Sequence, residues 1–511
     1  MKKAPRRVLW YIVSISCTIV LAEMDGGNVV ITNEEIIELL KQKQFNDARS
    51  ACVERLQENR IDSQAWSSLG ESFAQQQHGT MALKCFRRAR LLDPFSRWID
   101  DAIAFSEGIQ DDFTDQIVMD LLEVPHKTVT ALLLTRDSSR TIAACLTPLK
   151  NAVDEIIVVD TGSIDDTVQI VEGMDIHVHH FAWCDDFSAA RNFSLGLANS
   201  DWVIAIDSDE ILNHEDVFLI REAAGIFDSV SDQFVLQIVR TNQANGMQGR
   251  DFEARMFPRN RNLRWVRSIH EQIRNPDETR PRKFYINIRF FHDGYDPTVV
   301  STYDKARRNV KLLRQEVNKY PNDLDIHFFL GRDALRIGEV EEAIHHLEKA
   351  CSIGESVPQQ DVELSNVYRL LTIAYESGGR YDDAERNASE TITRFPAYPD
   401  GYFQHASLLM RRIHKYINTS LQEIAQAKDN ARSYISMADT DPALATWKTD
   451  IAHGDLARFL GNLRETRNSY KKALSYGLHL PEVQKALANL DNDILMLAEE
   501  IKRERNPLND Q

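Results

Sequence analysis

Two aspartates, Asp207 and Asp209, stand on either side of Ser208 directly after the apolar run of residues 202–206. The run is rich in β-branched and aromatic residues, as expected of a buried strand. Residues i and i+2 at the end of an extended strand point the same way, so the two carboxylates can converge. Converging carboxylates need a cation, and their oxygens suit Mg²⁺ or Mn²⁺. Such an ion would neutralise a diphosphate, either in binding it or as it leaves.

Two apolar runs upstream end in a similar way. Residues 128–134 are followed by Thr135, Arg136 and Asp137, and residues 155–159 are followed by Asp160. Each run has the length and composition of a buried strand. A lone D-x-D motif is usually a solvated acidic turn, but here three apolar strands end in acidic residues. This context favours a functional site.

Helical patterns at 140–150 and 165–173 separate the three runs. Buried strands that alternate with helices predict a parallel sheet covered on both faces. Ligands bind at the carboxyl ends of the strands in such sheets, so the three acidic strand ends are expected to form one site. We expect this α/β domain to span residues 126–298.

The sequence around these strand ends resembles a known enzyme family. Residues 128–210 are similar to family-2 glycosyltransferases of the GT-A (Rossmann-like) fold, with the elements in the family order. The similar segments are LLLTRDSSRTIAACL, VDEIIVVDTGSIDDT, DDFSAARNFSLGLANSDWVIAIDSDE and the later IHEQI and FFHDGY. The resemblance implies a glycosyltransferase with a nucleotide-sugar donor, UDP-sugar first among them, and Mn²⁺ or Mg²⁺ as cofactor.

The resemblance also implies roles for individual residues. Asp160 is expected beside the nucleotide base and Arg191 near the donor. Asp207 and Asp209 are expected to hold the metal ion of the donor diphosphate, with the second aspartate usually dominant. His292 fits the late histidine that often completes the metal or phosphate site.

The chain departs from the family pattern at the end of the first strand. The family usually has a T-x-N or K-N-E motif there, whereas this chain has Asp137 at the asparagine position, two residues after Thr135. We expect both residues to contact the donor. The departure bears on the nucleotide or its orientation and leaves the predicted fold unchanged.

An inverting transfer needs a carboxylate that takes the proton of the acceptor as the nucleophile attacks the anomeric carbon. Glu271 lies in the region where the family places its acid, and Asp293 is the alternative. Glu271 could instead form a structural ion pair, with Arg255 or Arg267 as the partner.

Helical repeats flank the predicted α/β domain. Residues 63–96 resemble the 34-residue tetratricopeptide repeat (TPR) at its diagnostic positions. Those positions hold Trp66, Leu69, Gly70, Phe73, Ala82, Phe86, Ala89 and Pro94. Further repeats are expected at 29–62, 324–357, 365–398 and 447–480, with a degenerate helix pair at 399–446 and a capping helix at 481–505.

The predicted architecture is therefore a GT-A domain inserted between all-α TPR-like arms at 24–110 and 299–511. About three repeats are needed for a stable array. The two N-terminal repeats are thus expected to pack on the α/β domain or on the C-terminal arm. TPR arrays present a concave surface that commonly holds extended peptides, which favours a protein or peptide acceptor. A cell-surface or lipid-linked glycan acceptor and an inactive TPR scaffold are the alternatives.

The N-terminus carries basic residues before an apolar run at residues 8–22, so residues 1–23 are a possible signal or anchor segment. Translation from Met24 is a further possibility. We expect a cytoplasmic enzyme, with membrane contact only through residues 8–22 if these are retained. The alternative is a membrane-anchored or exported protein.

The composition excludes several other classes of protein. A formal net charge of −17 argues against nucleic-acid binding. The 6 cysteines show no C-x-x-C pair, which argues against metal–thiolate sites and a disulfide framework.

Overall fold

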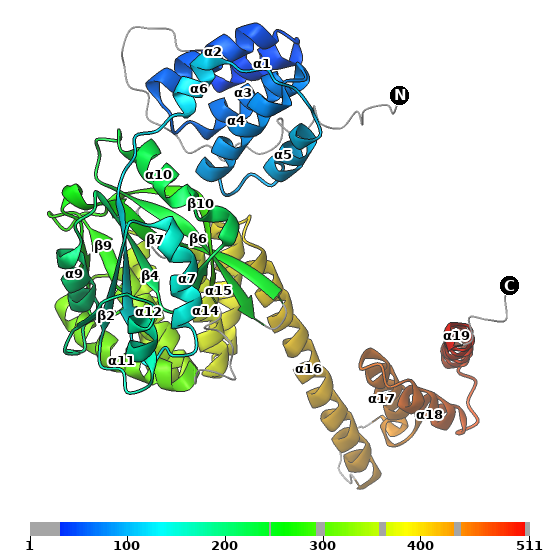
Figure 1. Cartoon of the computed structure of the whole chain (residues 1–511). Coiled ribbons are helices and arrows are strands. Elements are labelled where there is room, and N and C mark those ends of the chain that lie inside the picture. Colours follow the sequence, from blue (N-terminus) through cyan, green and yellow to red (C-terminus); the bar gives the residue numbers. More distant parts are fainter. Residues whose placement is uncertain (1–30, 245–246, 293–301, 357–363, 434–440, 506–511) are drawn as a thin grey trace. The chain divides into compact units, whose positions relative to one another are not determined.

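The computed structural model describes residues 31–244, 247–292, 302–356, 364–433 and 441–505 (Figure 1). The chain divides into two compact units, Met1–Pro321 and Asn322–Gln511. The first contains the α/β domain and the N-terminal helices, and the second contains the C-terminal helices.

The first unit is built on an eight-stranded sheet with the order β3-β2-β1-β4-β7-β6-β10-β5. The parallel part holds β1 (Val129–Thr135), β2 (Glu155–Asp160), β3 (Val178–His180) and β4 (Trp202–Asp207). The three strands expected from the apolar runs are confirmed as β1, β2 and β4. The helices α7 (Ile142–Ala152) and α8 (Thr167–Glu172) lie between them in the chain, as predicted.

Both faces of the sheet are covered. Ala131 and Leu133 of β1 belong to one core cluster with α7 and α10 (Leu219–Phe227), while Leu132 belongs to the opposite cluster, which includes the end of α9 (Phe187–Leu197). Successive side chains of a strand point to opposite faces, so continuous apolar runs are what a doubly covered strand requires. The mixed sheet with helices on both faces is a GT-A fold.

Besides the short β3, the four strands beyond β4 in the sheet have no counterpart among the predicted strands. The additional strands are β5 (Glu210–Leu212), β6 (Phe234–Ala244), β7 (Met247–Pro258) and β10 (Arg282–His292). Strand β7 runs antiparallel to β4 and β6, and β5 runs antiparallel to β10, so the sheet is mixed and not parallel throughout as predicted. Parallel pairing joins β1 to β4 and also joins β6 to β10. In β7 the charged residues Asp251, Glu253 and Arg255 alternate with apolar ones, so this strand contains no continuous apolar run. A separate hairpin pairs β8 (Arg264–Val266) with β9 (Gln272–Arg274).

The N-terminal repeats form helix pairs where the repeat pattern predicts them. These are α1 (Asn33–Lys41) with α2 (Phe45–Glu58) and α3 (Ser63–Gln75) with α4 (Gly79–Leu92), followed by α5 (Ile99–Glu107) and α6 (Gln116–Leu122). The repeats pack on the α/β domain, which was the first of the two expected arrangements. Arg88 of α4 is buried and its Nε donates to Glu222 of α10 at 2.9 Å. Leu91 joins the core of the sheet.

Gly70 lets α3 and α4 approach closely within the second repeat. A Cβ atom at this position would lie 2.7 Å from two ring atoms of Phe86. We expect Gly70→Ala to lower the free energy of unfolding by about 1–3 kcal/mol through overpacking. Gly196 is the matched control, because a Cβ on this exposed residue of α9 meets nothing within 4 Å. Gly196→Ala should be neutral or stabilising by up to about 1 kcal/mol. Denaturant unfolding of the full chain measures both, and equal effects would contradict the repeat packing.

The first unit ends with a long helix, α11 (Thr302–Lys319), that contacts the start of α9. The Arg308 guanidinium lies 5.5 Å from the centre of the Phe187 ring, and Lys311 Nζ lies 3.5 Å from Asp185 Oδ2. The structure therefore divides the chain after Pro321 rather than at residue 299.

The second unit is all helical. Its helices are α12 (Leu324–Arg336), α13 (Val340–Gly354), α14 (Leu364–Ser377), α15 (Tyr381–Arg394), α16 (Pro399–Ser433), α17 (Trp447–Phe459), α18 (Leu463–Leu474) and α19 (Pro481–Arg505). The expected pair of helices at 399–446 is wrong, because α16 is a single helix of 35 residues. After Gly401 its sequence contains no glycine or proline that would end it. Gly331 packs closely against Leu347, and Gly454 packs closely against Tyr470. The repeat pattern predicts a close contact between helices at both glycines.

The expected signal or anchor segment lies outside the described residues. Within the ranges that the structure describes, none of the helices has the length and apolar character needed to cross a membrane.

Candidate active site

The three predicted strand ends lie side by side. Thr135 of β1 pairs with Asp160 of β2, and Leu134 pairs with Asp207 of β4. Thr135 is 2% exposed, and its hydroxyl has no hydrogen-bond partner among the described residues. A buried hydroxyl without a partner costs free energy, so it is suited to contact a ligand here.

The turn after β2 is organised around Asp160, whose side chain is buried. Its carboxylate accepts from the backbone N–H of Gly162 at 3.1 Å and from the Ser163 hydroxyl at 2.5 Å. His180 Nδ1 of β3 lies 3.5 Å from the Asp160 Oδ2 atom. These contacts fix the carboxylate at the carboxyl ends of the parallel strands.

Asp137 is part of the same turn. Its backbone has a φ of 50°, in the left-handed region that asparagine and aspartate adopt more readily than most residues. Its Oδ1 accepts from the N–H of Ile164 at 2.8 Å, and its own N–H donates to the Ser163 hydroxyl at 2.9 Å. The aspartate at this departure from the family pattern therefore holds the loop after β1 against the loop after β2.

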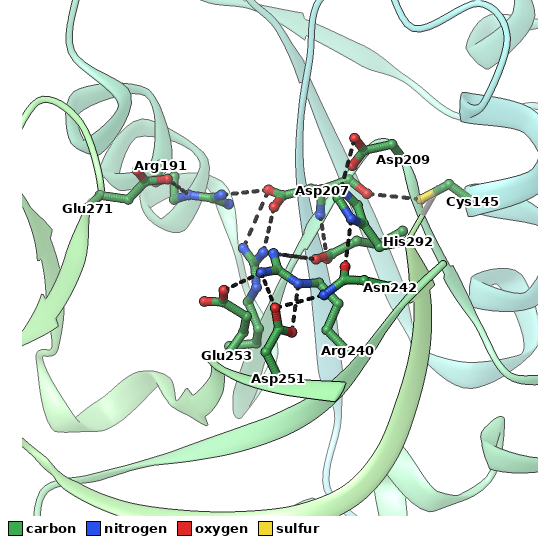
Figure 2. Close-up of polar contacts among 12 residues, drawn as sticks. Cys145, Arg191, Asp207, Asp209, Arg240, Asn242, Asp251, Glu253, Glu271 and His292 are labelled. Atoms are coloured by element: carbon green, nitrogen blue, oxygen red, sulfur yellow. Dashed lines mark hydrogen bonds and ion pairs between the residues drawn. The ribbon is translucent and has the colours of Figure 1, made fainter. Parts of the chain in front are cut away.

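Arg191 joins the two acidic parts of the site (Figure 2). Its Nη2 donates to Asp207 Oδ1 at 2.7 Å and its Nε donates to Glu271 Oε1 at 2.6 Å. The neighbouring Asn192 exchanges two hydrogen bonds with the backbone of Trp265, at 2.8 and 3.0 Å. This pairing fixes α9 on β8 and so positions the arginine. Glu271 does form an ion pair, which was the alternative to a catalytic role. Its partner is Arg191 and not Arg255 or Arg267.

Arg255 of β7 is a site residue that the sequence did not reveal. Its Nη2 donates to Asp207 Oδ2 at 2.5 Å and to Glu210 Oε1 at 3.0 Å. Burial opposes ionisation of Asp207, but the guanidinium groups of Arg255 and Arg191 outweigh it and hold the pKa well below its usual range. Burial raises the pKa of the neighbouring Glu210 to about 7 despite the arginine. The one sequence signal for this residue is the alternation of charged and apolar residues along β7.

Replacing Arg255 should destabilise the domain strongly. Arg255→Met leaves the carboxylates of Asp207 and Glu210 without their shared cation, and we expect a loss of about 3–5 kcal/mol in unfolding free energy. Arg264→Met is the matched control, because Arg264 pairs with Glu278 where both side chains are at least half exposed. Exposed pairs contribute about 0–1 kcal/mol. A stable Arg255→Met protein in denaturant unfolding would contradict the importance of this network.

Asp209 and His292 approach each other at the neighbouring edge of the site. His292 Nε2 lies 3.3 Å from Asp209 Oδ2, and His292 Nδ1 lies 2.9 Å from Asn242 Oδ1. The imidazole is buried, whereas 34% of the Asp209 side chain is exposed. Of the three predicted metal ligands, the structure brings Asp209 and His292 together (Figure 2). The third, Asp207, pairs with Arg191 and Arg255. Within the described part of the chain, no three His, Cys, Asp or Glu residues form a metal-ligating group. Asp293 lies outside the described residues.

Comparison with known proteins identifies a glycosyltransferase domain in this part of the chain. Residues 131–295 match the family model described as Glycosyl transferase family 2. The SPbeta prophage-derived glycosyltransferase SunS of Bacillus subtilis is 28% identical over 296 residues, which are 57% of this chain and 69% of that protein. A TPR repeat-containing protein of Synechococcus elongatus is 26% identical over 286 residues, 53% of this chain and 69% of that protein. The solved structure of S. aureus TarS with UDP-GlcNAc is 16% identical, with a TM-score of 0.31, and covers 53% of this chain and 93% of that one.

Proposed function

We propose that this chain, whose residues 131–295 form a family-2 glycosyltransferase domain, is a metal-dependent enzyme that transfers a sugar from a UDP-sugar to its acceptor with inversion. The observation that carries the proposal is the pairing of Asp209 with His292 beside a carboxylate already neutralised by two arginines. The metal, the nucleotide, the stereochemistry and the acceptor are the parts that need testing.

The Asp209–His292 pair fits a divalent cation. In an octahedral site with bonds of about 2.0–2.1 Å, two ligand atoms at right angles lie about 3 Å apart. The 3.3 Å between Asp209 Oδ2 and His292 Nε2 is close to this separation. Carboxylate oxygen and imidazole nitrogen are both common ligands of divalent metals. The bound ion would supply positive charge to the departing diphosphate.

We propose a different task for Asp207 from direct binding of the metal. Its two oxygens accept from Arg191 and Arg255 at 2.7 and 2.5 Å, so its charge is already compensated by the protein. It therefore fixes two buried cations next to the proposed metal. We propose that Asp209 and His292 bind the metal directly and that Asp207 serves the donor site through these arginines.

Glu271 is the proposed base. Its Oε1 accepts from Arg191 Nε at 2.6 Å, and its side chain is 16% exposed. One guanidinium separates Glu271 from Asp207, so the proposed base lies on the far side of Arg191 from the donor-side carboxylate (Figure 2). An inverting transfer requires the base and the leaving group to lie on opposite sides of the anomeric carbon. The base deprotonates the nucleophile on one side, and the diphosphate departs on the other.

UDP is the proposed nucleotide. The buried turn around Asp160 offers a fixed carboxylate at the end of β2, and Thr135 offers a hydroxyl without a partner in the described structure. A carboxylate accepts readily from a base N–H group. Calorimetric titration of the protein with UDP should show binding in the presence of Mn²⁺ and much weaker binding in EDTA. Equal binding under both conditions would contradict the metal, and no binding under either would contradict the donor.

The C-terminal helices are proposed to hold a protein or peptide acceptor. Removing residues 322–511 leaves the whole first unit, including α11. We expect this truncation to keep most UDP-sugar hydrolysis and to lower acceptor transfer by at least about tenfold, since remote binding energy is lost. Assays of both reactions on the same protein measure the ratio. Equal losses would mean that the helices only stabilise the domain, and would favour a glycan acceptor bound elsewhere.

A further inference from the structure

Asn242 lies directly beside His292 because of the strand register. The parallel pairing of β6 with β10 places Asn242 opposite His292, and the antiparallel pairing of β6 with β7 places Arg240 opposite Asp251. Arg240 and Asn242 are two residues apart on β6, so their side chains point to the same face of the sheet. Three neighbouring strands thus bring these four side chains into one row.

The row is continuous in hydrogen bonds. Arg240 donates to both oxygens of Asp251, from Nε at 2.9 Å and from Nη2 at 2.8 Å. Asn242 Nδ2 donates to Asp251 Oδ2 at 2.9 Å. The Asn242 Oδ1 atom then lies 2.9 Å from His292 Nδ1, and His292 Nε2 faces Asp209 (Figure 2).

The chemistry of the row determines where the imidazole proton lies. Asp251 is ion-paired with Arg240, so its carboxylate only accepts hydrogen bonds. The amide NH₂ of Asn242 must therefore face Asp251, which leaves the amide oxygen facing His292. A carbonyl oxygen only accepts, so His292 Nδ1 must carry the proton. In the neutral imidazole, Nε2 then presents its lone pair.

The lone pair of His292 Nε2 is directed at Asp209 Oδ2, which is also an acceptor, across 3.3 Å. Positive charge relieves the repulsion of these two acceptors, and either a metal ion between them or a second proton on the imidazole supplies it. If the side-chain amide of Asn242 were rotated by 180°, its oxygen would lie 2.9 Å from the Asp251 carboxylate. That would place two acceptors even closer together than Asp209 Oδ2 and His292 Nε2. The row thus directs Nδ1–H to Asn242 and leaves Nε2 as the ring atom that can bind a metal ion beside Asp209.

We infer that Asn242, held by the Asp251–Arg240 ion pair, is a positioning residue that sets the tautomer of His292 so that Nε2 binds the metal. This inference rests on the proposed function. Asn242 does not touch the metal or the substrate. It acts through the histidine, as residues that hydrogen-bond to metal-ligating histidines generally do.

Two measurements on the full chain test the inference. The first is long-range ¹H–¹⁵N correlation NMR of ¹⁵N-histidine-labelled protein without metal at pH 8, with the His292 signals assigned from His292→Gln. The second is the Mn²⁺ affinity in the presence of UDP, from the electron paramagnetic resonance of free Mn²⁺. Both are applied to the wild type, to Asn242→Leu and to Thr241→Val. Thr241 is the matched control, because it is the preceding residue of β6 and points to the opposite face.

We expect the proton of His292 on Nδ1 in the wild type and in Thr241→Val. In Asn242→Leu the proton should move in part or wholly to Nε2, and the Mn²⁺ affinity should fall by roughly 10–100-fold. A wild-type His292 protonated at Nε2, or an Asn242→Leu protein with unchanged tautomer and Mn²⁺ affinity, would overturn the inference. If the wild type binds no Mn²⁺, the proposed metal fails, while the tautomer of the wild type still decides the role of Asn242. The wild-type spectrum also decides it if Asn242→Leu does not fold.

Discussion

Replacing Asp209 with asparagine is expected to lower the kcat/KM of sugar transfer by roughly 10²–10⁴-fold while the protein stays folded. Asparagine has the same shape as aspartate but no charge. Of the two proposed metal ligands, only His292 is then unchanged. Asp209 forms no ion pair with Arg191 or Arg255, and Asp207 keeps both arginines in the variant. The measurement is steady-state transfer at saturating Mn²⁺, together with thermal unfolding.

Asp232→Asn is the control for the Asp209 variant. Asp232 is an exposed aspartate of the same domain, and it lies 3.4 Å from Arg282 with 59% of its side chain exposed. It should retain wild-type transfer. An Asp209→Asn enzyme with wild-type kcat/KM would exclude Asp209 as a metal ligand.

Glu271→Gln is expected to abolish transfer without weakening donor binding. The glutamine oxygen still accepts from Arg191, so the arginine stays in place next to Asp207. The amide cannot take a proton, and loss of a general base typically costs about 10²–10⁴-fold. The expected signature is therefore a fall in kcat with little change in the dissociation constant of UDP, measured by calorimetry.

Glu278→Gln is the matched control for the base, because Glu278 pairs with Arg264 at the surface with 58% of its side chain exposed. Transfer by Glu278→Gln should equal that of the wild type. Unchanged transfer by Glu271→Gln would eliminate Glu271 and leave Asp293 as the alternative base.

The parallel half of the site could be predicted because its signals are local. Apolar runs identified β1, β2 and β4, and the residues that follow each run gave Asp160 and Asp207. The repeat positions of α3 and α4 were equally local, since Gly70 meets Phe86 within one repeat. In each case one short segment forms the strand or helix and also contains the residue that this element positions.

The other half of the site depends on strand register and could not be predicted in this way. Arg255 reaches Asp207 only because β7 pairs with β4, and its sequence separation from Asp207 is 48 residues. Asn242 meets His292 across 50 residues because β6 pairs with β10 in parallel. The alternating charged residues of β7 look like solvent-exposed positions, although here Asp251 and Glu253 pair with Arg240 of β6 beside the site.

The role that we propose for Asp207 differs from the expected one for the same reason. From the sequence alone, two carboxylates in a D-x-D motif appear equivalent and share a cation. The structure supplies Asp207 with two buried arginines from α9 and β7, and it supplies Asp209 with a histidine from β10. The partners that distinguish the two aspartates come from distant segments of the chain.

The most direct test of the central claim is the release of UDP from a panel of UDP-sugars by the full-length protein, with Mn²⁺ and with EDTA. Parallel reactions contain GDP- and ADP-sugars, and the same panel is run with Asp209→Asn. The proposed function predicts release of UDP from at least one UDP-sugar, dependent on Mn²⁺ and lost in the variant. Absence of turnover for every donor, or turnover that is equal in EDTA, would contradict a metal-dependent glycosyltransferase.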